Sequence, residues 1–155
     1  MRLESSVLVE RPAAAVWEYL GKVENVSEWD RGVSATKVTS SVAAGVGLEF
    51  DTLARRSGRA VGDEWGRMSY RVADIDQVRG CTVELTSRNG NARYFKRASW
   101  RFRVEEESGG SRVYCTAEFQ LRLRYIVLGP VLFGMRSAIR RDLESLKRAV
   151  EAVGS

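Results

Sequence analysis

Apolar residues near the end of the chain recur every three or four positions, which predicts one long amphipathic helix over residues 128–153. Pro130 suits the first turn of this helix, and Gly154 suits the position just after its end. The opposite face is charged, so the helix is expected to lie across another apolar surface. The apolar stripe consists of Leu128, Leu132, Met135, Ile139, Leu143, Leu146 and Val150.

Alternation of apolar and polar residues predicts strands in most of the preceding chain. A first strand over residues 3–9 is followed by two short helices over residues 13–20 and 23–29. Residues 53–63 are rich in Arg, Ser and Gly and are expected to form a loop or a frayed hairpin end. The other predicted strands span residues 33–41, 46–52, 64–74, 81–88, 93–105 and 112–124.

The last four strands can be aligned by placing turns at residues 74–76, 89–91 and 108–111. Apolar residues then lie opposite apolar residues, as a half-buried antiparallel sheet requires. The three expected inner rows are Tyr70, Val83, Ala98 and Phe119; Val72, Cys81, Trp100 and Ala117; and Met68, Leu85, Lys96 and Leu121. The expected outer face holds Arg67, Arg71, Glu84, Arg97, Arg101, Arg103, Glu118, Arg122 and Arg124.

The order of these elements predicts an α+β fold. A curved seven-stranded antiparallel sheet follows from the strands, with two short helices after the first of them. The sheet has one apolar face and the long C-terminal helix has one apolar stripe, so each is the natural cover of the other. The chain of 155 residues is expected to form a single domain.

The chain contains no histidine, which excludes Ser-His-Asp and Cys-His catalysis and histidine-ligated metal. No metal and no cofactor are expected. The two cysteines, Cys81 and Cys115, would lie two strand spacings apart, about 9–10 Å, which exceeds the reach of a disulfide. Both are expected to be small buried thiols in a reduced interior.

The net charge of +5 raises the question of an anionic partner. Glu84 is expected opposite Arg97, and no aromatic residues interleave with the outer arginines, so a solvated basic face is favoured over a nucleic-acid site. No apolar run approaches the ~20 residues that span a bilayer, and the N-terminus lacks the apolar core of a signal peptide. A cytoplasmic protein without membrane insertion is therefore expected, and its oligomeric state stays open.

Several stretches along the chain resemble the START-like superfamily, also called helix-grip or Bet v 1-like, and within it the polyketide cyclase/dehydrase group. The matching stretches are ERPAAAVWEYL, SEWDRGV, Gly45-Val46-Gly47, GGSRVYCTAEF and DLESLKRAVE. The resemblance spans essentially the whole chain. It implies a hydrophobic ligand held between the concave face of the sheet and the long helix.

Ala98 and Ala117 are small residues at central inner positions, and they leave room for helix side chains or for a ligand. Tyr70 is the candidate catalytic residue, because its hydroxyl could donate a hydrogen bond to a ligand carbonyl. The simpler interpretation of Tyr70 is a core tyrosine whose hydroxyl is satisfied locally. The expected ligand-binding residues are Phe50, Met68, Tyr70, Leu85, Trp100, Ala117, Phe119, Leu132, Met135 and Ile139.

Three functions therefore remain open at the level of the sequence. The first is non-covalent binding of a small hydrophobic or aromatic ligand, lipid- or polyketide-like, in the cavity between sheet and helix. The second is a polyketide cyclase/aromatase-type enzyme that steers ring closure there without metal or histidine. The third is binding of an anionic surface or nucleic acid through the outer arginines.

Overall fold

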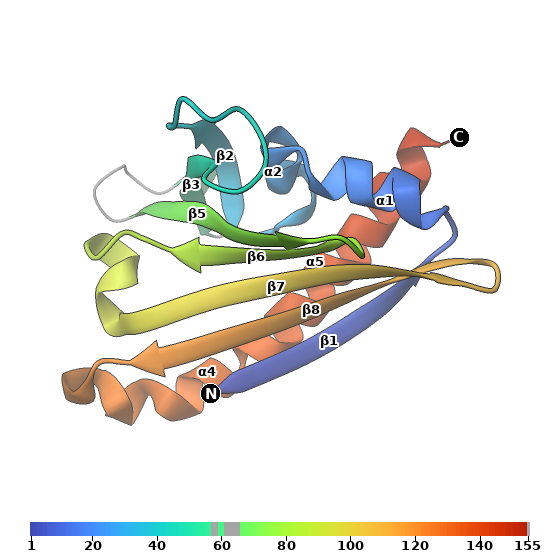
Figure 1. Ribbon diagram of the computed structural model, residues 1–155. Helices are drawn as coiled ribbons and strands as arrows, with labels where there is room; N and C mark the ends of the chain where they lie inside the picture. The colour runs from blue at the N-terminus through green and yellow to red at the C-terminus, as the bar shows by residue number, and fades with distance from the viewer. Residues whose placement is uncertain (57–58, 61–65, 155) are drawn as a thin grey trace.

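A computed structural model describes residues 1–56, 59–60 and 66–154 of the chain. Seven strands form one antiparallel path in the order β1-β8-β7-β6-β5-β3-β2, and the short strand β4 pairs with β3 beside it (Figure 1). The strands are β1 (Arg2–Val9), β2 (Val33–Val38), β3 (Glu49–Arg56), β4 (Arg59–Ala60), β5 (Arg67–Asp76), β6 (Gly80–Leu85), β7 (Phe95–Glu107) and β8 (Gly110–Leu121).

The helices follow the predicted order, and the long C-terminal helix α5 crosses one face of the sheet (Figure 1). The α-helices are α1 (Ala13–Leu20), α2 (Val26–Trp29), α4 (Gly129–Phe133) and α5 (Met135–Val153). The 3-10 helices are η1 (Val23–Asn25), η2 (Gly90–Tyr94) and η3 (Leu123–Leu128). The α+β helix-grip architecture predicted from the sequence is confirmed.

The segment expected to be a loop or a frayed hairpin end contains strand residues. Its first residues, 53–56, continue strand β3, and residues 59–60 form β4. The remaining expectations for residues 57–58 and 61–63, and for the start of the next strand at residues 64–65, lie outside the described residues.

The pairing of β7 with β8 agrees with the prediction, because Ala98 lies opposite Phe119. The predicted pairings of β6 with β5 and with β7 are each wrong by two residues, since Tyr70 lies opposite Leu85 and Val83 lies opposite Trp100. The cause is the turn: β5 continues to Asp76, and the chain reverses afterwards, where Arg79 adopts a left-handed φ of 54°. A two-residue shift preserves the face of every side chain, so the predicted inner and outer faces of β5 and β6 are retained.

The predicted inward position of Lys96 is wrong. An irregularity between Phe95 and Arg97 places Phe95 opposite Leu121, and Lys96 is exposed. One extra residue in the strand at this point reverses the alternation that the prediction assumed.

The predicted single helix over residues 128–153 is wrong in being continuous, because it is interrupted at Gly134 between α4 and α5. The chain passes through η3 and α4 and reaches Gly134 before α5 begins at Met135. The consecutive apolar residues Val131, Leu132 and Phe133 cannot all lie on one stripe, and only Leu132 is buried. The remaining stripe residues agree with the prediction, from Ile139 to Val150.

The most tightly packed part of the interior lies beneath the C-terminal half of α5. There the strands β1, β7 and β8 contribute valines that meet leucines of the helix. These residues, each at most 1% exposed, are Val9, Val104, Val113, Leu143 and Leu146.

Candidate functional site

An aromatic row crosses the inner face of the sheet. Its successive ring centroids lie 5.4 Å apart between Phe50 and Tyr70, and 5.5 Å apart for Tyr70 with Trp100, Trp100 with Phe119, and Phe119 with Phe95. The rings come from β3, β5, β7 and β8, so the row forms only when the sheet is assembled. Phe95 was missing from the predicted site, because the strand irregularity had not been foreseen and Lys96 was given its place.

The inner surface is covered unevenly along its length. At the end nearest the start of α5, side chains that face inward remain only half-buried, in contrast to the dry valine and leucine core at the other end. These half-buried inner residues are Met68, Tyr70, Leu85, Phe95, Trp100 and Met135. This end therefore offers apolar surface that the protein's own side chains do not fully cover.

The other predicted site residues are buried within the core. Leu132 and Ile139 are each 8% exposed and close the helix side of this region. Ala117 has no exposed surface and Ala98 has 1%, so neighbouring side chains cover the two small central positions. Phe50 and Phe119 are buried on either side of the half-buried rings of Tyr70 and Trp100.

The sheet opens between β6 and β7. Their pairing ends at Glu84 opposite Ser99, and a hollow of about 250 Å³ begins beyond that pair. Leu85, Phe95 and Ala98 line it together with charged residues of the outer face. A second, shallower hollow of about 550 Å³ lies over the outer side of the sheet, lined by residues of β1, β6, β7 and β8.

A polar group interrupts the aromatic row at Tyr70. Burial raises the pKa of the Tyr70 hydroxyl, and the nearby Asp30 carboxylate raises that pKa further. A hydrogen bond with Thr52 acts in the opposite direction and lowers the pKa, but it is the smallest of the three effects. Thr52 is itself an inward residue of β3, 5% exposed. The Tyr70 hydroxyl therefore stays protonated at neutral pH, and in the structure it donates a hydrogen bond to the sulfur of Met68 at 3.7 Å.

Two carboxylates, Asp30 and Asp142, lie behind this polar group. Asp30 follows α2 and accepts the Gly32 amide at 2.9 Å, and Asp142 of α5 accepts the Arg31 amide at 3.2 Å. Burial raises the pKa of Asp30, and burial together with the charge of Asp30 raises the pKa of Asp142 to about 6. Neither residue was among the expected site residues, because 111 positions separate the segments that meet. The only sequence signals were the stretches SEWDRGV and DLESLKRAVE, which contain Asp30 and Asp142 respectively.

Both cysteines are free thiols, as the strand spacing predicts. Burial, followed by the charge of Asp142, raises the pKa of Cys115 to about 12. Burial, followed by the charge of Asp74, raises the pKa of Cys81 to about 11. Thiols with these pKa values are poor nucleophiles at neutral pH.

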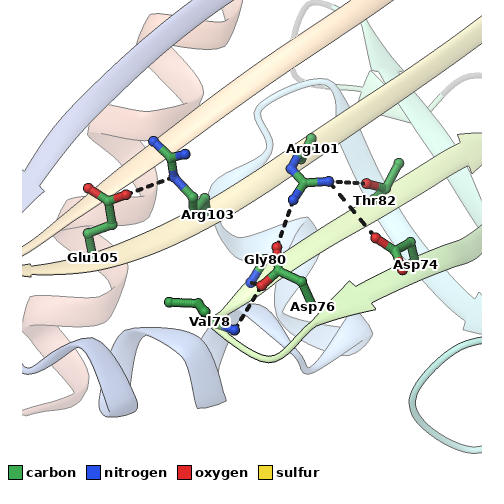
Figure 2. Close-up of polar contacts among 8 residues, drawn as sticks. All are labelled: Asp74, Asp76, Val78, Gly80, Thr82, Arg101, Arg103 and Glu105. Atoms are coloured by element: carbon green, nitrogen blue, oxygen red, sulfur yellow. Dashed lines mark hydrogen bonds and ion pairs between the residues drawn. The ribbon is translucent and has the colours of Figure 1, made fainter.

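Several outer arginines are engaged by carboxylates of the same or a neighbouring strand. Figure 2 shows Arg101 of β7 reaching across β6 to Asp76 at 2.7 Å and Asp74 at 3.9 Å, with Arg103 held by Glu105 at 3.0 Å. The predicted pair of Arg97 with Glu84 is also present, at 3.9 Å. Much of the positive charge on this face is therefore offset by nearby carboxylates.

Among the described residues, no group of three or more Cys, Asp or Glu side chains is placed to hold a metal ion. Within the same residues, no helix is both long enough and apolar enough to cross a bilayer.

A curved sheet that closes around a long C-terminal helix defines the helix-grip, or Bet v 1-like, class of protein. Within that class, the chain belongs to the polyketide cyclase / dehydrase and lipid transport family, whose model matches residues 1–151. Membership of this family supports ligand binding or cyclase activity in general terms. No curated protein sequence matches the chain.

Solved structures share the fold at low sequence identity. TTHA0849 from Thermus thermophilus is 17% identical with a TM-score of 0.76, and each chain covers 100% of the other. The di-domain ARO/CYC BexL from the BE-7585A biosynthetic pathway is 16% identical with a TM-score of 0.78, over 100% of this chain and 48% of that one. The Zhui aromatase/cyclase from Streptomyces sp. R1128 is 14% identical with a TM-score of 0.75, over 97% and 93%.

Proposed function

We propose that the protein binds a small hydrophobic or aromatic ligand, without covalent chemistry, between the aromatic row and the first turns of α5. The observation that carries this proposal is the uneven packing of the inner face. Tyr70, Trp100 and Met135 face the interior and are only half-buried, whereas Leu143 and Leu146 are at most 1% exposed. Uncovered apolar surface inside a fold is the usual setting for a small-molecule ligand.

The aromatic row favours a flat or unsaturated ligand over a plain alkyl chain. Aromatic rings pack on one another in offset or edge-to-face geometry, and the rings of Tyr70 and Trp100 already meet at 70°. A flat ligand beside them would extend the same pattern. The Tyr70 hydroxyl supplies one hydrogen-bond donor in this apolar surface, which suits a ligand with a carbonyl or hydroxyl oxygen.

A neutral fluorescent probe, N-phenyl-1-naphthylamine, tests the binding site directly. Trp100→Ala removes a ring from the centre of the row and should weaken the apparent affinity about tenfold, from the area that the indole contributes. Tyr114→Ala is the matched control, because Tyr114 is a half-buried aromatic residue of β8 that packs against Arg103 on the other face. The proposal predicts no loss of affinity for this control.

Native mass spectrometry of the purified protein provides the second measurement. A small molecule that co-purifies with the wild type and is lost in Trp100→Ala would support the proposed site. The proposal is wrong if the wild type neither carries such a molecule nor binds the neutral probe. Equal loss of probe binding in Tyr114→Ala would also contradict it.

A cyclase reaction is the second candidate function, and the protonated Tyr70 hydroxyl on the aromatic row favours it. A neutral phenol next to a substrate carbonyl can donate a hydrogen bond as negative charge develops on the carbonyl oxygen during an aldol-type ring closure. Tyr70→Phe removes that hydrogen bond but retains the ring. If a poly-β-carbonyl substrate still binds to Tyr70→Phe and its directed cyclisation is lost, the enzyme hypothesis is supported. Unchanged turnover would rule Tyr70 out.

A further inference from the structure

An exposed apolar patch lies on η3 and α4, beyond the end of β8 (Figure 1). Within eleven residues, five large aliphatic or aromatic side chains are 65% exposed or more. They are Leu123 (87%), Ile126 (65%), Val127 (79%), Val131 (69%) and Phe133 (67%). Burying these groups would be favourable, so a cluster of this kind marks an interaction surface.

Arginines lie on both sides of the apolar patch along the sequence. No Asp or Glu occurs between Glu118 and Asp142, and this interval holds five arginines. Four of them are exposed and form what we term the basic flank: Arg124, Arg136, Arg140 and Arg141. Arg136 and Arg140 are one helical turn apart on α5 and therefore project from the same side of it.

The basic flank differs from the outer arginines of the sheet. No ion pair within the described part of the chain engages Arg124, Arg136 or Arg140, whereas Arg101 and Arg103 are each held by a carboxylate. Arg124 instead lies 4.9 Å from the ring centroid of Tyr125. The positive charge at this end of the molecule is thus left for a partner.

Exposed aliphatic side chains combined with uncompensated arginines fit the surface of an anionic bilayer. Aliphatic groups enter the boundary between headgroups and acyl chains, and arginines are attracted by anionic headgroups. A second copy of the chain fits poorly, because a symmetric contact would bring two sets of unpaired arginines together. A nucleic acid would offer nothing apolar to Val127, Val131 or Leu123.

We propose that the apolar patch and the basic flank dock the protein on an anionic lipid surface. The chain then lies on the bilayer, with η3 and α4 as the contacting segment. Leu132 of α4 points into the interior, and the half-buried Met135 follows directly, so the docked segment borders the incompletely covered end of the inner face.

Co-sedimentation with vesicles tests the docking. The probes are vesicles of phosphatidylcholine alone and of phosphatidylcholine mixed with phosphatidylglycerol. The wild type should bind the mixed vesicles more strongly, and high salt should weaken the binding. Val131→Ser should lower the partition coefficient about tenfold. Its control is Val78→Ser at the β5–β6 turn, where valine is 70% exposed, and this variant should bind like the wild type.

Charge is tested separately. Arg136→Gln with Arg140→Gln should weaken binding to the mixed vesicles roughly 25-fold, at about fivefold for each arginine near an anionic surface. Arg148→Gln, an exposed arginine near the other end of α5, should leave it unchanged. Every substituted side chain is exposed, so folding should be retained and is checked by circular dichroism.

The proposal is overturned if the wild type binds neither vesicle, or if Val131→Ser binds as well as the wild type. It is also overturned if analytical ultracentrifugation shows self-association that Val131→Ser abolishes, which would assign the patch to a second copy. Binding of single-stranded RNA that depends on the arginines but not on Val131 would assign the basic flank to a nucleic acid. No pocket ligand enters this experiment, so its result is independent of the proposed function.

Discussion

Replacing Asp142 by asparagine should stabilise the protein at neutral pH. The carboxyl of Asp142 is half-buried and faces the charge of Asp30, and these two causes raise its pKa from 3.8 to about 6. A carboxyl whose pKa is higher in the folded state than in the unfolded state costs stability when it is ionised. Asparagine removes the charge and keeps an oxygen that can accept the Arg31 amide hydrogen bond of 3.2 Å.

The magnitude follows from the shift in pKa. A rise of about two units corresponds to about 3 kcal/mol of free energy of unfolding. Because the side chain is partly open to water, screening reduces this to about 1–2 kcal/mol. The sign is fixed: the cost is absent below the unfolded-state pKa near 4 and is complete above the folded-state value near 6. The ionisation of Asp142 therefore lowers the stability of the wild type as the pH rises from about 4 to about 6.

Urea unfolding followed by tryptophan fluorescence, repeated between pH 4 and pH 7, measures the effect. The free energies of wild type and Asp142→Asn should agree near pH 4 and diverge by about 1–2 kcal/mol at pH 7. Glu144→Gln removes an exposed carboxyl of the same helix and should not change the pH dependence. A variant that is less stable than the wild type at pH 7, or a difference that does not vary with pH, would refute the reasoning.

Three further predictions concern the core, a turn and a thiol. Leu146→Ala in the dry core, where this leucine is 0% exposed, should lower the free energy of unfolding by about 3–4 kcal/mol in urea titrations. Gly110→Ala should destabilise the protein by at least about 3 kcal/mol, because φ is 154° and the new Cβ would clash with a carbonyl oxygen of β1. Gly109→Ala should cost only about 1 kcal/mol, because φ is 84° there and the space around it is open. In the Cys81→Ser variant, Cys115 should react with a disulfide reagent only as fast as the protein unfolds, because Cys115 is 3% exposed and its pKa is about 12. Rapid reaction of Cys115 in the folded protein would contradict this prediction.

The faces of the sheet could be derived from the sequence because side chains alternate strictly along a strand. Ala98 and Phe119 were placed opposite each other correctly, and Tyr70 and Leu85 were placed on the correct face in the wrong pairing. The register of two strands depends on where the turn between them closes. In this turn the left-handed position is occupied by Arg79, whereas glycine or asparagine is the usual residue there. The face to which a side chain points is set by its position along one strand, whereas the register is set by how two strands pair.

The candidate site was only partly accessible to sequence reasoning. Four rings of the aromatic row were among the expected ligand-binding residues, and their assignment to a ligand stays a prediction. Phe95 was missed because one irregular step in β7 exchanges its orientation with that of Lys96. Asp30 and Asp142 were missed because nothing local in the sequence shows that the two carboxylates meet, and their pKa values depend on burial that exists only after folding.

The sequence by itself determined the order of elements, the apolar face of the sheet and the C-terminal stripe that covers it, because a repeat of two or of three to four residues is a property of neighbours in the chain. The tertiary structure decided where that helix begins, which carboxylates meet, and which apolar residues stay uncovered. Leu123 and Leu146 are the same amino acid, and one is 87% exposed whereas the other is 0% exposed. The hydrophobic effect depends on how much apolar surface each side chain exposes to water. That exposure is set by packing between residues far apart in the chain, which the local sequence pattern does not contain.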